Sequence, residues 1–127
     1  MRRILVVDDF KPWRDAARQM IEEQPELQIV AEATDGEEAV RLAAALKPDL
    51  VVLDIGLPKI NGLQAAAQIF RVSPASRVLF LSMQNDPATI EATLSLGAAG
   101  YVNKLNAGNQ LLSAITTALD AGIAAVH

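Results

Sequence analysis

The sequence predicts a single doubly wound α/β domain, in which helices cover both faces of a mainly parallel sheet. Short β-rich runs alternate five times with segments of helical periodicity, and right-handed crossovers between parallel strands place helices above and below such a sheet. The chain has 127 residues, of which 51% are hydrophobic and 20% charged. This length and composition suit one compact core and exclude a disordered chain.

Five short runs rich in aliphatic and β-branched residues are typical of buried strands. They cover residues 4–7, 28–31, 50–53, 78–81 and 100–102. A segment with helical spacing follows each of them, so five strand–helix units are expected in order along the chain.

Caps and apolar stripes indicate the first two helices. The second begins at Thr34-Asp35-Gly36-Glu37, which has the spacing of a capping box, and ends before Pro48. The first has Pro12 in its first turn, and its apolar stripe consists of Trp13, Ala16, Ala17, Met20 and Ile21. Trp13 is expected to be a core or rim residue of that helix.

The other three helices differ in the apolar surface that they offer. The third is expected at about residues 62–70, after a turn at Asn61-Gly62, and the fourth between a cap at Asp86 and a C-terminal Gly97. The fourth has the smallest apolar face, which makes it a candidate moving part. The fifth has the largest, formed by Leu111, Leu112, Ile115, Ala118, Leu119 and Ile123.

Polar side chains follow four of the five expected strands. In a doubly wound sheet, ligands bind outside the carboxyl ends of the strands, so these side chains are expected at one edge. Three ionised carboxylates among them repel one another, and the cluster therefore needs a cation besides its lysine. In chain order the side chains are Asp8, Asp9, Asp54, Ser82, Asn103 and Lys104.

The residue types at this edge suit phosphoryl transfer. Oxygen ligands without His or Cys favour Mg²⁺, or Mn²⁺, over zinc. An Asp carboxylate can attack phosphorus and form an acyl phosphate while a metal ion and a lysine neutralise the transferring group. Each residue alone has a simpler interpretation: the aspartates as loop caps, Ser82 as a turn hydroxyl and Lys104 as a solvated charge. Their shared position favours the joint interpretation.

These residues resemble a known family, the receiver domains of bacterial two-component response regulators. The resemblance covers essentially the whole chain and implies a five-stranded, flavodoxin-like (βα)5 fold. It also implies a phosphorylation-activated switch that catalyses its own phosphorylation and dephosphorylation and is not a metabolic enzyme. The matching residues are Asp8-Asp9, Asp54 with Pro58 and Asn61-Gly62, then Ser82, Tyr101 and Lys104.

The resemblance implies a role for each site residue. Asp54 would accept a phosphoryl group from a sensor histidine kinase or a histidine phosphotransfer protein, and Lys104 and Ser82 would each contact a phosphoryl oxygen. Tyr101 would reorient when Ser82 moves. The populations of the alternative conformations of the surface formed by helix four, strand five and helix five would then shift. Tyr101 has simple packing as its alternative. Mg²⁺ would be held by Asp8, Asp9, Asp54 and the carbonyl of Gly56.

The chain departs from the family pattern at several positions. Leu105 follows the lysine where many receivers have a proline, so no cis peptide is expected there. Gly56 and Gln84 occupy the two positions that tune hydrolysis in the family, and neither is acidic. Met83 stands where many receivers have a small residue and is expected to cover part of the site.

A LuxR-like branch of the family is indicated by the Ser-Met pair at residues 82–83 and by the GAAGYV segment at residues 97–102. Residues 1–122 are expected to form the receiver domain, and residues 123–127 resemble the start of a linker to an absent DNA-binding domain. Transcriptional output through that domain and homodimer formation are expected from the likeness. With a net charge of −4, this domain alone is not expected to bind nucleic acid.

Composition also restricts where the chain acts. Its apolar runs are too short for a membrane helix or a secretory signal, so a cytoplasmic location without membrane contact is expected. The absence of cysteine excludes a disulfide framework and thiolate chemistry.

Three other functions are weighed against the receiver interpretation. A haloacid dehalogenase-type phosphatase needs a second acid two residues after its nucleophile, where this chain has Gly56. A flavodoxin-like flavin binder needs a Ser/Thr/Gly-rich loop after the first strand, where Asp8-Asp9 would repel the phosphate. A degenerate or stand-alone receiver that acts only as an interaction module is the stronger alternative, because a fold alone does not establish chemistry. Against it, no expected active-site residue is missing.

Overall fold

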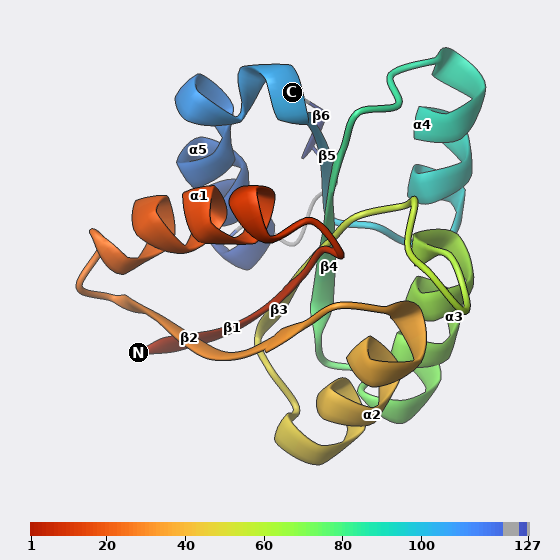
Figure 1. Ribbon diagram of the computed structural model, residues 1–127, viewed down its shortest axis with the longest axis horizontal. Helices are drawn as coiled ribbons and strands as arrows, with labels where there is room; N and C mark the ends of the chain where they lie inside the picture. The colour runs from red at the N-terminus through yellow and green to blue at the C-terminus, as the bar shows by residue number, and fades with distance from the viewer. Residues whose placement is uncertain (121–124, 127) are drawn as a thin grey trace.

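The computed structural model describes residues 1–120 and 125–126, and it shows one sheet between two layers of helices (Figure 1). The strands are β1 Arg2–Val7, β2 Leu27–Ala33, β3 Leu50–Leu53, β4 Arg77–Ser82, β5 Gly100–Asn103 and β6 Ala125–Val126. The helices are α1 Lys11–Glu22, α2 Gly36–Leu46, α3 Gly62–Val72, α4 Pro87–Ser95 and α5 Ala107–Asp120, with a 3-10 turn, η1, at Lys104–Asn106.

The sheet has the strand order β2-β1-β3-β4-β5-β6, and every neighbouring pair is parallel. This confirms the predicted doubly wound fold and its five strands. The two-residue strand β6, which the sequence did not indicate, extends the sheet beyond β5. Strand β2 lies on one side of β1, and the later strands β3 to β6 follow one another on its other side. Ligands bind at the point between β1 and β3 where the strand order reverses.

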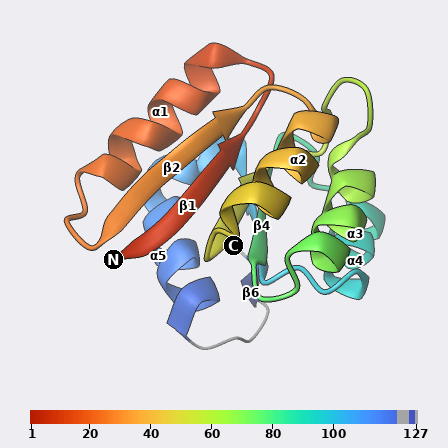
Figure 2. The ribbon, with the colours of Figure 1, turned by 90° about the horizontal axis from the view of Figure 1, so that it is seen from below.

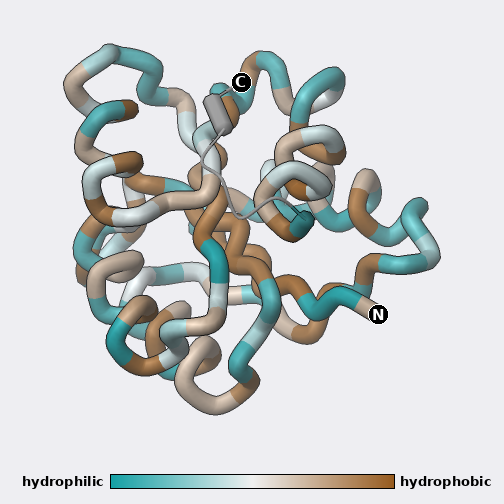
Figure 3. The backbone as a smooth tube through the Cα atoms, turned by 180° about the vertical axis from the view of Figure 1, so that it is seen from behind, coloured by the Kyte–Doolittle hydropathy of each residue, from teal (hydrophilic) through white to brown (hydrophobic). Residues whose placement is uncertain are grey.

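Helices cover both faces of the sheet. Helices α1 and α5 lie on one face, and α2, α3 and α4 lie on the other (Figure 2). The central strands β3 and β4 are almost wholly buried, which explains their continuous apolar sequence. The hydrophobic segments accordingly gather in the middle of the molecule (Figure 3).

The cap of α2 differs by one residue from the predicted capping box. Asp35, and not Thr34, is the N-cap, and its carboxylate accepts a hydrogen bond from the Glu38 backbone N–H at 2.8 Å. The Glu38 carboxylate in turn accepts from the Thr34 N–H at 2.8 Å. Thr34 and Asp35 are both good N-caps, so the sequence alone does not decide which of the two begins the helix.

Helix α3 begins directly against the end of β3. Asn61 is its N-cap in a full capping box with Gln64, as the predicted turn at Asn61-Gly62 requires. The Gly62 N–H donates to the Ile55 carbonyl at 2.7 Å. A Cβ on Gly62 would lie 2.1 Å from the carbonyl oxygen of Asp54 and 2.7 Å from the Ile55 Cα. Only glycine therefore permits this approach of two backbones.

Helix α4 has little anchorage in the core. Asp86 is its N-cap, as predicted, and Thr93 is its single buried residue. The helix ends one residue earlier than expected, with Leu96 as C-cap, and Gly97 follows with a φ of 102°. That left-handed conformation favours glycine.

The C-terminal predictions are only partly covered by the described residues. Helix α5 is described to Asp120, so Ile123 of its predicted apolar face lies outside. Of the predicted tail at residues 123–127, only the backbone strand at 125–126 is described. None of the helices in the described part has the length and apolarity needed to cross a bilayer.

Candidate functional site

The register of the parallel strands brings the predicted site residues to one edge of the sheet. Val7 of β1 pairs with Leu53 of β3, and the Asp54 N–H donates to the Val7 carbonyl at 3.1 Å. The residues that follow these two strands, Asp8 and Asp54, are therefore neighbours. Their adjacency is a consequence of backbone pairing and does not depend on side-chain rotamers.

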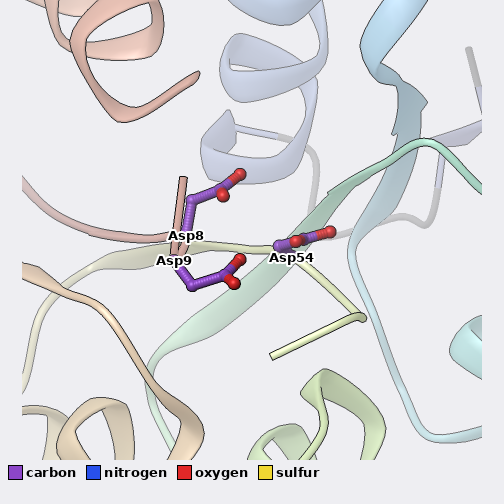
Figure 4. Close-up of side chains that lie close together, drawn as sticks. All are labelled: Asp8, Asp9 and Asp54. Carbon is purple, nitrogen blue, oxygen red and sulfur yellow. The ribbon is translucent and has the colours of Figure 1, made fainter. Parts of the chain in front are cut away.

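Three carboxylates form a cluster at this edge. One oxygen each from Asp8, Asp9 and Asp54 lies within 4.8 Å of the other two. The side chains of Asp8 and Asp9 point toward the end of β3, where Asp54 lies (Figure 4). Asp8 and Asp54 are buried and Asp9 is exposed, so the cluster opens to solvent on one side. This all-oxygen donor set suits a hard divalent cation.

Lys104 supplies the positive charge within the described cluster. Its Nζ lies 2.6 Å from Asp8 Oδ2 and 3.5 Å from Asp54 Oδ2, and its side chain is only 4% exposed. A buried ion pair of this kind has unusually strong coupling because water screens it little. The lysine predicted from strand five is thus in contact with both buried aspartates.

The surroundings of Asp54 make its ionised form less favourable than it is in water. Burial raises the pKa of Asp54, the Lys104 ammonium counteracts this, and the neighbouring Asp8 adds to the rise. A hydrogen bond from the Ile55 N–H to Asp54 Oδ1, at 2.8 Å, lowers the pKa. The cluster thus carries more negative charge than its single lysine compensates.

This excess charge predicts a stabilising substitution at Asp54. Asparagine retains the shape of the side chain and removes one of three clustered charges. In EDTA, Asp54→Asn is expected to raise the Tm by roughly 3–6 °C in a domain of this size. Thermal unfolding followed by circular dichroism measures this. Asp120→Asn, at an exposed ion pair with Arg2, should shift the Tm by less than about 2 °C. An Asp54→Asn Tm below that of the wild type would contradict the charge argument.

The loop that carries Asp8 and Asp9 is held from two directions. The Phe10 N–H donates to Asp8 Oδ1 at 2.9 Å, and Arg14 Nη1 donates to the Asp8 carbonyl at 2.8 Å. Arg14 also pairs with Glu32 of β2 at 3.3 Å, where both side chains are mostly buried. The sequence did not single out Arg14, because nothing in a helical charge pattern shows which carbonyl an arginine reaches.

Ser82 and Tyr101 are both buried near the site. Ser82 ends β4 beside Asn103 of β5, and its Oγ accepts a hydrogen bond from the Gln84 N–H at 3.2 Å. Burial raises the pKa of Tyr101, with a smaller opposing effect of the Ser82 hydroxyl. The Tyr101 hydroxyl lies near Ser82 but has no hydrogen-bond partner among the described residues.

The remaining predicted residues lie at the rim. Gly56 and Gln84 are exposed, and a Cβ on Gly56 would meet no atom within 4 Å. Met83 and Leu105 are also exposed. The Lys104–Leu105 peptide is trans, in agreement with the absence of a proline.

Comparison with known proteins places this geometry in a family context. The protein-family model of the response regulator receiver domain matches residues 4–116 of this chain. The transcriptional regulatory protein DegU of Brevibacillus brevis is 32% identical over 94% of this chain and 51% of its own length. The nitrate/nitrite response regulator protein NarL of Escherichia coli K12 is 34% identical over 88% of this chain and 52% of its own length. The chain thus spans about half the length of these relatives.

A solved structure shows the same architecture. The crystal structure of a LuxR-family two-component response regulator from Aurantimonas sp. SI85-9A1 superposes with a TM-score of 0.91 at 38% identity. The match covers 97% of this chain and 87% of that one.

Proposed function

This chain belongs to the family of response regulator receiver domains, and from that membership we propose that Asp54 is its phosphoacceptor. Proteins of this family are phosphorylation-activated switches in two-component signalling. The donor would be a phosphohistidine on a sensor kinase or on a phosphotransfer protein. The Asp54 carboxylate attacks phosphorus, the bond to the donor nitrogen breaks, and an acyl phosphate forms.

One observation carries this proposal: the pairing of β1 with β3 sets Asp54 beside Asp8, and Lys104 contacts both. Asp54 is buried enough to be held in one place, while exposed Asp9 leaves the cluster accessible. A nucleophile at the centre of such a cluster is what phosphoryl transfer to a carboxylate requires.

The proposed metal ligands are Asp8, Asp9, Asp54 and the backbone carbonyl of Gly56. Bound Mg²⁺, or Mn²⁺, would neutralise charge on the transferring phosphoryl group. Arg14 and the Phe10 N–H hold the Asp8 loop in place for this ligand set. The three carboxylates lie close enough together to share one ion.

Lys104 and Ser82 would receive the phosphoryl oxygens. The Lys104 ammonium already contacts Asp54, and Ser82 ends β4, the strand next to β3. Neither Gly56 nor Gln84 carries a charged group that would orient an attacking water. Autodephosphorylation would then proceed without an orienting charge from either position.

The proposed switch runs from Ser82 through Tyr101 to the surface of α4, β5 and α5. Tyr101 is buried and its hydroxyl has no hydrogen-bond partner in the part of the chain that the structure describes, so a change at Ser82 can offer it a new partner. Helix α4 has one buried residue, and little packing resists its displacement. Because the transcriptional regulatory protein DegU and the response regulator NarL are about twice this length, transcriptional output would require a further domain, and a homodimer would be one route to it.

Intact-mass measurement after incubation with Mg²⁺ and acetyl phosphate tests the proposed function. A single phosphoryl adduct, stable in acid and labile in base, is expected on the wild-type chain. Asp54→Asn is expected to give none, while circular dichroism shows it folded. The proposal fails if the wild-type chain remains unmodified, as an interaction module without phosphotransfer would, or if the adduct persists in Asp54→Asn.

A further inference from the structure

Trp13 contacts the lysine at the centre of the site. The Lys104 ammonium lies over its ring, 5.2 Å from the ring centroid. This distance is within the range of a cation–π interaction, and tryptophan is the aromatic residue that forms the strongest ones. The sequence predicted a core or rim residue of the first helix at this position.

The surroundings of Lys104 give this contact a role. An ammonium has three N–H donors, and Asp8 and Asp54 lie on the side that faces the cluster. The indole face lies against the same ammonium, whose side chain is almost fully shielded from water. Trp13 is thus one of the side chains that lie against this shielded charge.

The first turn of α1 is itself held firmly. Pro12 restricts its backbone, and the Trp13 and Arg14 N–H groups donate to the Phe10 carbonyl at 3.1 and 3.2 Å. Arg14, the next residue, holds the Asp8 carbonyl. One turn of helix therefore contacts both the metal-ligand loop and the lysine.

We propose that Trp13 is a positioning residue for Lys104, and this rests on the proposed phosphoacceptor function. On phosphorylation, the ammonium would move from Asp8 toward a phosphoryl oxygen on Asp54. The indole face keeps it shielded from water and within reach during that move. Leucine is closer in volume to phenylalanine than to tryptophan and has no π face, so it supplies some shielding but no attraction for the cation.

Kinetics with a small donor separate this role from packing. With acetyl phosphate and saturating Mg²⁺, Trp13→Leu is expected to slow adduct formation by about three- to tenfold, and Trp13→Phe to recover most of the rate. The loss should fall on the maximal rate, while the Mg²⁺ concentration at half-saturation stays unchanged. A small donor excludes effects on partner docking.

Fluorescence gives a second readout that needs no variant at Trp13, the only tryptophan in the chain. Beryllofluoride, a phosphoryl analogue, should change its emission in the presence of Mg²⁺ as Lys104 moves, and Asp54→Asn should abolish this change.

Two kinetic results would overturn the inference alone while the wild-type chain still forms its adduct. One is an unchanged rate in Trp13→Leu, and the other is an equal loss in the Leu and Phe variants. Emission that does not respond to beryllofluoride would also overturn it. A wild-type chain that forms no adduct would overturn the proposed function together with this inference.

Discussion

Alanine at position 62 is expected to lower the free energy of unfolding by about 3 kcal/mol. Its Cβ would lie 2.1 Å from the Asp54 carbonyl oxygen and 2.7 Å from the Ile55 Cα. Both neighbours are backbone atoms, so no side-chain rotation can relieve the overlap. Either α3 or the end of β3 must move, and the latter carries the proposed phosphoacceptor. Urea unfolding followed by circular dichroism measures the loss.

A matched control for this substitution is Gly108→Ala in the first turn of α5. No atom lies within 4 Å of a Cβ built there, and alanine favours a helix over glycine by up to about 1 kcal/mol. Gly108→Ala should therefore be neutral or stabilising. If Gly62→Ala has the same urea midpoint of unfolding as the wild type, α3 does not approach the end of β3 as closely as described.

Lys104→Met is expected to destabilise the metal-free protein by about 3–5 kcal/mol, because it leaves two buried carboxylates without their cation. Asp8 and Asp54 would then face each other and Asp9 with no positive charge in contact. Mg²⁺ should restore much of the stability, since it supplies the missing charge. Urea unfolding in EDTA and in Mg²⁺ measures both effects, and adduct formation should be slowed as well.

Lys11→Met removes an equal charge at the surface and serves as the control. Lys11 pairs with Asp15 at 2.8 Å, but its side chain is 71% exposed. An exposed pair of this kind contributes less than about 1 kcal/mol, and Mg²⁺ should have no special effect on the variant. Equal losses in the two variants, or a loss in Lys104→Met that Mg²⁺ does not reduce, would contradict the proposed charge balance.

The fold and the residues at the strand ends could be predicted because both depend on local pattern. Apolar runs of three or four residues and helical stripes indicate where strands and helices form, and Asp8, Asp54 and Lys104 follow their strands directly. Parallel pairing then places these positions at one edge. The predictions were less accurate at helix ends: the cap of α2 is at Asp35, and α4 ends at Ser95. Adjacent residues that can both cap leave such boundaries ambiguous.

The sequence by itself determined the alternation of strands and helices, the acidic strand ends and the likeness to receiver domains. Only the tertiary structure decided that Trp13 covers Lys104, that Arg14 holds the Asp8 carbonyl and that Gly62 lies against the Asp54 backbone. Periodicity and strand ends are properties of neighbouring residues. These three contacts join separate segments, and they depend on how each crossover sets its helix on the sheet, which no local pattern encodes.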